Sequence, residues 1–402
     1  MNTTSQHMLS QRVSSMSESA TIRMAQKGRE LKAKGYNVIS LSLGEPDFDT
    51  PQHIKDAAAQ ALNDGYTKYT PVPGLPEYVD AIKTKFARDN DLHFESNQIV
   101  VSNGAKQSIA NVFLSILDPG DEVIIFTPYW VSYYEIVKFA GGTPICLAAG
   151  IDQDFKVNAE QLEAAINHKT KAIIFSSPCN PTGSVYTRDE LESLAEVIEK
   201  YENLLVISDE IYEYINFTGQ HASIGAIDSI RDQVVTINGM AKGFSMTGWR
   251  LGYMGAPQWL ASACSKVQGQ FTSGAASFSQ KAAAVALTTD LSPTYEMRDA
   301  FLKRRDMVIA GLQQIPDMKV NHPTGAFYVF PDVSAYYGKS NGSMVIDDSD
   351  DFAELLLEGA HVATVAGSAF GDNNCIRISY AASEAELKEA IERIGNCLAE
   401  FK

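Results

Sequence analysis

Short, continuous runs of hydrophobic residues recur through the middle of the chain and predict buried strands. The runs are QIVVS (98–102), DEVIIF (121–126), KAIIFS (171–176), NLLVISD (203–209) and QVVTING (233–239). Continuous rather than alternating hydrophobicity is typical of strands buried on both faces, as in a parallel sheet covered by helices. We therefore predict an α/β fold in which helices sandwich a mostly parallel sheet.

Helical periodicity fills the segments between these runs. Hydrophobic residues recur at helical spacing at Ile109, Val112, Phe113, Ile116 and Leu117. A second helix is predicted at 187–201, where Thr187 is followed three positions later by Glu190, the pattern of a capping box.

The pattern changes after about residue 290. A long charged helix is predicted at 295–315, then short strands at 325–330 and 375–381, and a final helix at 383–401. A chain of 402 residues usually exceeds what one core serves. We predict an N-terminal arm joined to the small domain (1–45), a large domain (46–290) and a small α+β C-terminal domain (291–402).

Charge and cysteine content narrow the functional classes. The 33 Lys and Arg against 49 Asp and Glu give a net charge of −16, which disfavours nucleic acid and anionic membranes as partners. No apolar run reaches the length of a membrane span, and the N-terminus lacks a signal-peptide pattern. Five scattered cysteines favour a reducing cytoplasm, and the seven histidines form no HExxH pair, so no metal is expected.

Chemically useful side chains follow the carboxyl ends of the predicted strands, where ligands bind in such sheets. In chain order they are Gly104, Ala105, Trp130, Asn180, Asp209, Tyr212 and Lys242, with Arg250 eight residues later. A phosphorylated aromatic aldehyde would use this set. Its phosphate suits a helix N-terminus and a guanidinium, and its aldehyde suits a lysine. A carboxylate at Asp209 would keep a ring nitrogen protonated, so the set predicts pyridoxal 5′-phosphate as cofactor.

Several motifs resemble those of class I aminotransferases of pyridoxal-phosphate fold type I. They are SLGEPDFDTP, TKYTPVPGLPE, SPCNPTGSVY, SDEIYE, AKGFSMTGWRLGY and IRISYA. The resemblance runs from about Arg12 to the C-terminus. It is strongest to the bacterial-type aspartate aminotransferase subgroup, through SESAT, NGAKQ, PYWVSYYE and QGQFTSGAAS.

The resemblance implies a role for each matching residue at the cofactor. Lys242 would form the internal aldimine and carry the proton in a reversible ping-pong transamination. Asp209 would pair with the ring nitrogen, Tyr212 with the ring oxygen, and Trp130 would stack on the ring. The phosphate would be held by Arg250 and the helix start at Gly104, Ala105 and Lys106. Tyr69 would reach the phosphate of a neighbouring subunit, which implies a homodimer.

The resemblance also implies how substrate is held. Arg377 would clamp the α-carboxylate with help from Asn180 and Gly44, and Phe327 would form a nearby wall. Lys106, Ser19 and Thr21 would hold a distal carboxylate, with Thr272 and Ser273 contributing from the partner. Arg12 would extend this pocket to longer diacids. Lys106 as an ordinary helix lysine remains an alternative.

Two positions depart from the family pattern. Ala241 stands where many relatives have serine, which leaves a phosphate contact to be supplied elsewhere, with Asn238 as the candidate. Glu18 stands where a proline is common, and we expect its carboxylate to face solvent.

The resulting prediction is an aspartate:2-oxoglutarate aminotransferase acting on amino acids and 2-oxo acids. An aromatic, alanine or prephenate aminotransferase is the alternative, followed by a pyridoxal-phosphate-dependent lyase on the same fold. A DNA-binding regulator of this fold is disfavoured, because no basic helix-turn-helix pattern precedes the core. The donor range, the direction of flux and any assembly beyond a dimer do not follow from the sequence.

Overall fold

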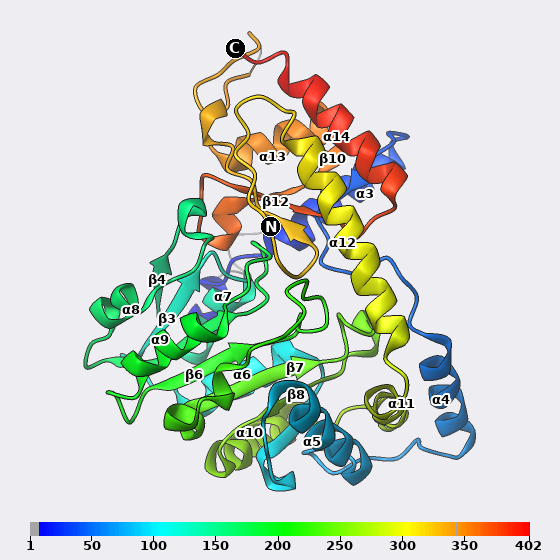
Figure 1. Ribbon diagram of the computed structural model, residues 1–402, viewed down its shortest axis with the longest axis vertical. Helices are drawn as coiled ribbons and strands as arrows, with labels where there is room; N and C mark the ends of the chain where they lie inside the picture. The colour runs from blue at the N-terminus through cyan, green and yellow to red at the C-terminus, as the bar shows by residue number, and fades with distance from the viewer. Residues whose placement is uncertain (1–7, 343) are drawn as a thin grey trace.

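A seven-stranded sheet forms the centre of the computed structural model, which describes residues 8–342 and 344–402 (Figure 1). The strand order is β2-β8-β7-β6-β5-β3-β4. The strands are β2 (Ile99–Ser102), β3 (Glu122–Thr127), β4 (Thr143–Ala148), β5 (Thr170–Ser176), β6 (Leu205–Asp209), β7 (Val234–Gly239) and β8 (Gly252–Gly255). Only β8 is antiparallel to its neighbours in this sheet.

The five predicted hydrophobic runs are the strands β2, β3, β5, β6 and β7, and the α/β fold is confirmed. Two strands of this sheet, β4 and β8, were not predicted from the sequence. Strand β4 lies at an edge and is only partly buried, and its short hydrophobic run, ICLA, was not predicted as a strand. Strand β8 reads GYMG, and its glycines conceal a fully buried strand.

Helices cover both faces of this sheet. One face packs against α6 (Ala105–Ile116), α7 (Ser132–Ala140) and α10 (Gln258–Phe271). The other face packs against two groups of helices, which are α4 (Gln52–Asn63), α5 (Pro76–Asn90) and α11 (Ser277–Thr288) toward β2, and α8 (Ala159–Ala165) and α9 (Arg188–Ile198) toward β5 and β6. The capping box predicted at Thr187 and Glu190 begins α9.

A smaller α+β layer lies above the sheet in Figure 1. It contains the antiparallel sheet β11-β12-β9 and the parallel pair β1-β10. These strands are β1 (Ile39–Ser40), β9 (Tyr328–Val329), β10 (Val362–Ala363), β11 (Val365–Ala366) and β12 (Ile376–Ser379). Its helices are α12 (Ser292–Leu312), α13 (Ser349–Glu358) and α14 (Glu384–Leu398).

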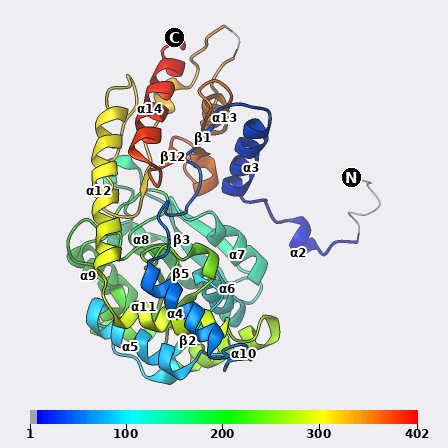
Figure 2. The ribbon, with the colours of Figure 1, turned by 90° about the vertical axis from the view of Figure 1, so that its right-hand side faces the viewer.

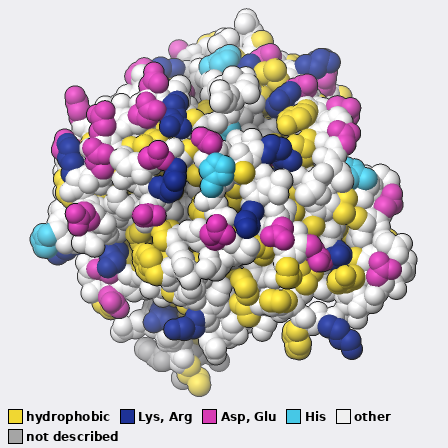
Figure 3. All heavy atoms as spheres, turned by 60° about the horizontal axis from the view of Figure 1, so that its bottom comes forward, with side chains coloured by type: hydrophobic (Ala, Val, Ile, Leu, Met, Phe, Trp, Pro, Cys, Tyr) yellow, Lys and Arg dark blue, Asp and Glu magenta, His cyan; other side chains and the backbone are white. Residues whose placement is uncertain are grey.

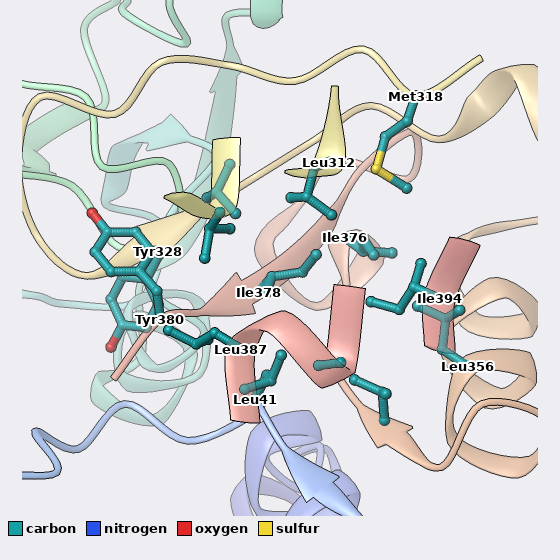
Figure 4. Packing of buried hydrophobic residues seen from close by; sticks show 14 of the residues in the cluster. Leu41, Leu312, Met318, Tyr328, Leu356, Ile376, Ile378, Tyr380, Leu387 and Ile394 are labelled. Carbon is teal, nitrogen blue, oxygen red and sulfur yellow. The ribbon is translucent and has the colours of Figure 1, made fainter. Parts of the chain in front are cut away.

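The core of the smaller layer draws on distant parts of the chain. Figure 4 shows Leu41 near Leu387 and Ile378, with Leu312 above them and Leu356 beside Ile394 at the other end of the cluster. Because Leu41 precedes the large sheet in sequence, the chain enters the smaller layer before it builds the larger one. The division into domains at 45 and 290 stays a prediction.

The N-terminal segment leaves one side of the body as α2 (Gln11–Ser14) and α3 (Ala20–Ala33) (Figure 2). Helix α3 lies beside α13, to which Lys27 is joined by a 2.6 Å ion pair with Glu354. Short 3-10 helices complete the chain at η1 (Ser96–Gln98), η2 (Ile151–Gln153), η3 (Ile224–Ala226), η4 (Asp228–Gln233), η5 (Thr247–Trp249), η6 (Ser334–Tyr336) and η7 (Gly367–Phe370).

Charged side chains of both signs intersperse with hydrophobic ones on the face shown in Figure 3. The excess of negative charge is therefore not gathered into one acidic patch on this face. Among the described residues, none of the helices combines the length and the hydrophobicity needed to cross a membrane.

Candidate active site

A cavity of about 370 Å³ lies where the carboxyl ends of the large sheet's parallel strands meet the smaller layer. Residues far apart in sequence converge on it. The predicted residues that line it are Ser19, Thr21, Gly44, Gly104, Ala105, Lys106, Trp130, Asn180, Asp209, Tyr212, Lys242, Arg250 and Arg377.

Lys242 lies in the turn that follows β7. Its Nζ donates to the backbone oxygen of Gly44 and lies 5.5 Å from the centre of the Tyr212 ring. Burial, followed by the positive charges of Arg377 and Arg250, lowers the pKa of Lys242 to about 8. The unprotonated fraction of this amine near neutral pH is therefore far larger than for an ordinary lysine, although it remains the minor form, and a nucleophile or a general base requires that form.

Asp209 ends β6 and is almost fully buried. Its Oδ2 accepts a 2.6 Å hydrogen bond from the Tyr133 hydroxyl, and its Oδ1 accepts one from the Ile211 amide. Burial raises the pKa of Asp209 to about 6, so the carboxylate is mostly ionised at pH 7. Tyr133 was missed from sequence, because a tyrosine inside a helix pattern has no feature that separates it from a core residue.

The N-terminus of α6 and the side chain of Arg250 lie together in the cavity lining, and both can donate hydrogen bonds to an anion. Gly104 has a φ of 89°, and a Cβ there would lie 2.5 Å from Nη2 of Arg250. Arg250 itself has a φ of 55°, and its Nη1 donates to the Thr247 oxygen at 2.8 Å. The glycine therefore makes room for the guanidinium beside the helix start.

One detail of this part of the cavity differs from the prediction. The Gly104 amide was expected to face the phosphate, but it donates to the Ser102 oxygen at 2.8 Å in a local turn. The amides of Ala105 and Lys106 open the helix and have no acceptor within it. These two amides are therefore the donors that this helix end offers to an anion.

Arg377 projects from β12 and is 1% exposed. Its Nη1 donates to Asn180 Oδ1 at 2.8 Å and its Nη2 to the Ser42 oxygen at 2.5 Å. The guanidinium lies 4.5 Å from the centre of the Tyr328 ring, and its Nε has no hydrogen-bond partner in the described chain. A buried cation with an unused donor fits a carboxylate ligand.

Lys106 also lines this cavity, in addition to Lys242, Arg250 and Arg377. The Nζ of Lys106 lies 4.9 Å from the centre of the Trp130 ring, and burial, followed by the charge of Arg250, lowers its pKa. Ser19 and Thr21 share a 2.8 Å hydrogen bond between their hydroxyls in the lining. Glu18 is exposed and borders a neighbouring cavity instead, in accord with the expected solvent-facing carboxylate.

Three predicted site residues do not line the cavity. Asn238 is buried in β7 and does not line the cavity; its Oδ1 accepts from the Gly239 amide at 2.7 Å, and its Nδ2 has no hydrogen-bond partner among the described residues. Phe327 lies behind Tyr212, and the next residue, Tyr328, lines the cavity in its place. Tyr69 is 97% exposed.

Residues expected to extend the pocket also lie outside it in this chain. Arg12 is exposed and its guanidinium lies 5.6 Å from the Phe139 ring centre. Thr272 accepts a 2.7 Å hydrogen bond from Gln107 Nε2 away from the cavity.

The donor set fits pyridoxal 5′-phosphate. Lys242 offers a partly unprotonated amine for the aldehyde, and Asp209 offers a buried carboxylate for the ring nitrogen. Arg250 and the free amides of α6 offer donors for the phosphate. The aldehyde, the ring nitrogen and the phosphate of the cofactor thus each have a chemically matched partner in one cavity.

Comparison with known proteins identifies the same family that the sequence motifs resemble. Residues 36–394 match the family model described as aminotransferase class I and II. Aspartate aminotransferase of Bacillus subtilis is 45% identical, over 96% of this chain and 98% of its own length. The bifunctional aspartate aminotransferase and glutamate/aspartate-prephenate aminotransferase of Petunia hybrida is 45% identical, over 98% of this chain and 83% of its own. The crystal structure of the Rhizobium meliloti aspartate aminotransferase has a TM-score of 0.95 and 41% identity, covering 98% of this chain and 99% of that one.

Proposed function

The chain belongs to the class I and II aminotransferase family, and we propose that it is a pyridoxal-phosphate-dependent aspartate:2-oxoglutarate aminotransferase. The observation that carries the substrate assignment is the pair of cations in one cavity, Arg377 from β12 and Lys106 from α6. A substrate with two carboxylates satisfies both cations, whereas alanine or phenylalanine leaves one of them unpaired and desolvated. Aspartate, glutamate and their 2-oxo acids have the required charges.

The proposed mechanism follows from the part of the cofactor or substrate that each side chain would bind. Pyridoxal phosphate, when bound, supplies a reactive aldehyde carbon and a protonated ring that stabilises negative charge on the substrate. Asp209 keeps the ring nitrogen protonated, and Arg377 with Asn180 orients the α-carboxylate. Lys242 Nζ would take the proton from the substrate Cα and deliver it to the aldehyde carbon of the bound cofactor. Because amino donor and keto acceptor use the same groups in turn, the reaction is ping-pong and reversible.

Initial rates with different amino donors test the substrate assignment. With 2-oxoglutarate as acceptor, we expect kcat/KM for aspartate to exceed that for alanine and phenylalanine. Prephenate as acceptor with glutamate or aspartate tests the second candidate activity, which is favoured by the names of relatives such as that of Petunia hybrida. A preference for monocarboxylic donors would overturn the assignment. Release of ammonia without an acceptor would identify a lyase instead.

Replacement of Lys106 by methionine is expected to lower kcat/KM for aspartate about 10- to 100-fold, because a hydrogen bond to a charged group is worth about 1.5–3 kcal/mol. Methionine keeps much of the side-chain length and the contact with Trp130. Rates with alanine should fall far less, and Lys106→Arg should retain most of the preference for diacids. An equal loss for aspartate and alanine would show that Lys106 serves the cofactor or the fold and not the distal carboxylate.

The proposed assembly is a homodimer with shared active sites in a reducing compartment. Its support is the 97% exposure of Tyr69, whose hydroxyl is free to reach a neighbouring subunit, and the free state of all five cysteines. We assign Tyr69 to the partner's phosphate, and Thr272 and Ser273 to the partner's substrate pocket.

Replacement of Tyr69 by phenylalanine is expected to weaken cofactor binding about 10- to 100-fold, which is the value of one hydrogen bond to a charged group. Titration of the apoprotein measures this change, and light scattering should give an unchanged dimer mass. Tyr36→Phe, at another exposed tyrosine, is the matched control. A monomeric wild-type protein, or unchanged cofactor affinity in Tyr69→Phe, would contradict the shared site.

A further inference from the structure

A buried network of charged side chains lies directly behind the residue assigned to the ring nitrogen. Glu210 follows Asp209 in sequence, is 1% exposed and does not line the cofactor cavity. Its Oε1 accepts hydrogen bonds from Ser208 Oγ at 3.0 Å and Ser223 Oγ at 2.6 Å. Its Oε2 lies 2.9 Å from His221 Nε2. Every oxygen of this carboxylate is therefore committed to an internal partner.

The network continues to a second buried carboxylate. Glu213 forms an ion pair with Lys85, which is fully buried, and accepts a 2.7 Å hydrogen bond from Asn90 Nδ2. The same amide donates to Glu210 Oε2 at 3.0 Å. Glu210, Glu213 and His221 place ligand atoms within 4.8 Å of one another, but the Lys85 ammonium already supplies a cation to this cluster. We therefore treat it as an ion-pair network.

The charge balance of the network depends on His221. Two carboxylates and one ammonium leave one negative charge, which is costly in a buried position unless another cation compensates it. The charged groups of the network that act on His221 are Glu210, Glu213 and Lys85, and His221 also lines a cavity with Arg88, Asp89, Asp91 and Arg188. Burial lowers the pKa of His221, but the charge and hydrogen bond of Glu210 outweigh that effect and raise it above its usual value. The imidazolium form makes the network neutral.

We propose that His221 is a positioning residue that keeps Asp209 ionised by neutralising Glu210, the carboxylate next to it in the chain. Burial and the negative charge of Glu210 both raise the pKa of Asp209 and therefore oppose its ionisation. Without the imidazolium, the full charge of Glu210 acts on Asp209, and the carboxylate takes up a proton at higher pH. The ring nitrogen then loses its anionic partner. This role rests on the proposed cofactor site.

The test is the pH dependence of cofactor affinity in the full-length apoprotein, titrated with pyridoxal phosphate by fluorescence. In His221→Gln, which keeps an N–H donor but no charge, we expect the acidic fall in affinity to begin about one pH unit higher. In Glu210→Gln it should begin lower than in the wild type. The double variant should return close to the wild-type profile. Thermal unfolding of each variant records stability separately.

Opposite shifts in the two single variants are the signature of charge compensation, because a purely structural network would destabilise both variants without moving the profile. Unmoved profiles, or shifts in the same direction, would overturn the proposal. If His221→Gln fails to fold, the sign of the shift in Glu210→Gln decides alone. Failure of the wild-type protein to bind the cofactor would overturn the proposed function as well, whereas binding with unshifted variants would overturn only the role of His221.

Discussion

Replacing Lys242 with alanine is expected to lower kcat for transamination of aspartate by at least about 10,000-fold, the upper range for removal of a general acid–base. We expect a large loss because the Nζ atom of Lys242 has two proposed roles, binding the cofactor and transferring the proton. The Nζ is buried, partly unprotonated and placed in the cavity beside Tyr212, and we propose that it both anchors the cofactor and carries the proton. Stopped-flow absorbance after mixing with aspartate measures the loss directly.

Lys242→Arg is the informative control, because it keeps a cation in the cavity but supplies no free amine near neutral pH. We expect it to be as inactive as the alanine variant. Borohydride reduction and peptide mass mapping of the wild type should place the cofactor on the Lys242 peptide. Modification of a different lysine, or substantial activity in Lys242→Ala, would contradict the assignment.

Replacing Arg377 with alanine is expected to lower kcat/KM about 30- to 5,000-fold, since truncating one member of a buried charged contact costs about 2–5 kcal/mol. The loss should apply to every amino acid, because every substrate carries an α-carboxylate. This separates Arg377 from Lys106, whose loss should lower rates with diacids far more than rates with alanine. The guanidinium is held by Asn180 and the Ser42 oxygen before any substrate arrives, so little reorganisation accompanies binding.

Steady-state kinetics with aspartate and alanine measures this effect. Arg231→Ala removes a surface guanidinium paired only with Asp228 and should leave both rates unchanged. If Arg377→Ala impaired aspartate but spared alanine, Arg377 would hold the distal carboxylate, and the assignments of the two cations would have to be exchanged.

Sequence patterns predicted the strands that carry the site because strand burial is visible in short stretches of sequence. A strand buried on both faces needs continuous hydrophobicity, and the residue after its carboxyl end reaches the edge where ligands bind. Asp209 and Lys242 follow that rule, and both line the cavity. The hydrophobic run of the edge strand β4, ICLA, is short, and the glycine-rich β8 lacks such a run, so pairing with their neighbours identifies both strands.

The remaining errors concern which atom faces the cavity. Phe327 precedes strand β9, and its ring centre lies 4.8 Å from the ring centre of Tyr328, the first residue of that strand. The packing of these two neighbouring rings decides that Tyr328 lines the cavity. The Gly104 amide donates to a local hydrogen bond instead. This orientation depends on the backbone dihedral angles, and glycine can adopt many of them, so the sequence does not predict it. Tyr133 and the network around His221 depend on contacts between residues distant in sequence, and no short motif carries that information.

The absorbance spectrum of the purified protein with its cofactor, recorded before and after L-aspartate is added without an acceptor, tests the central claim most directly. We predict that the visible band of the lysine-bound cofactor converts to that of the aminated cofactor, and that 2-oxoglutarate restores it. Together the two changes demonstrate both half-reactions. A visible band that ignores aspartate but responds to alanine or phenylalanine would contradict the diacid assignment. No visible band after incubation with pyridoxal phosphate would contradict the site itself.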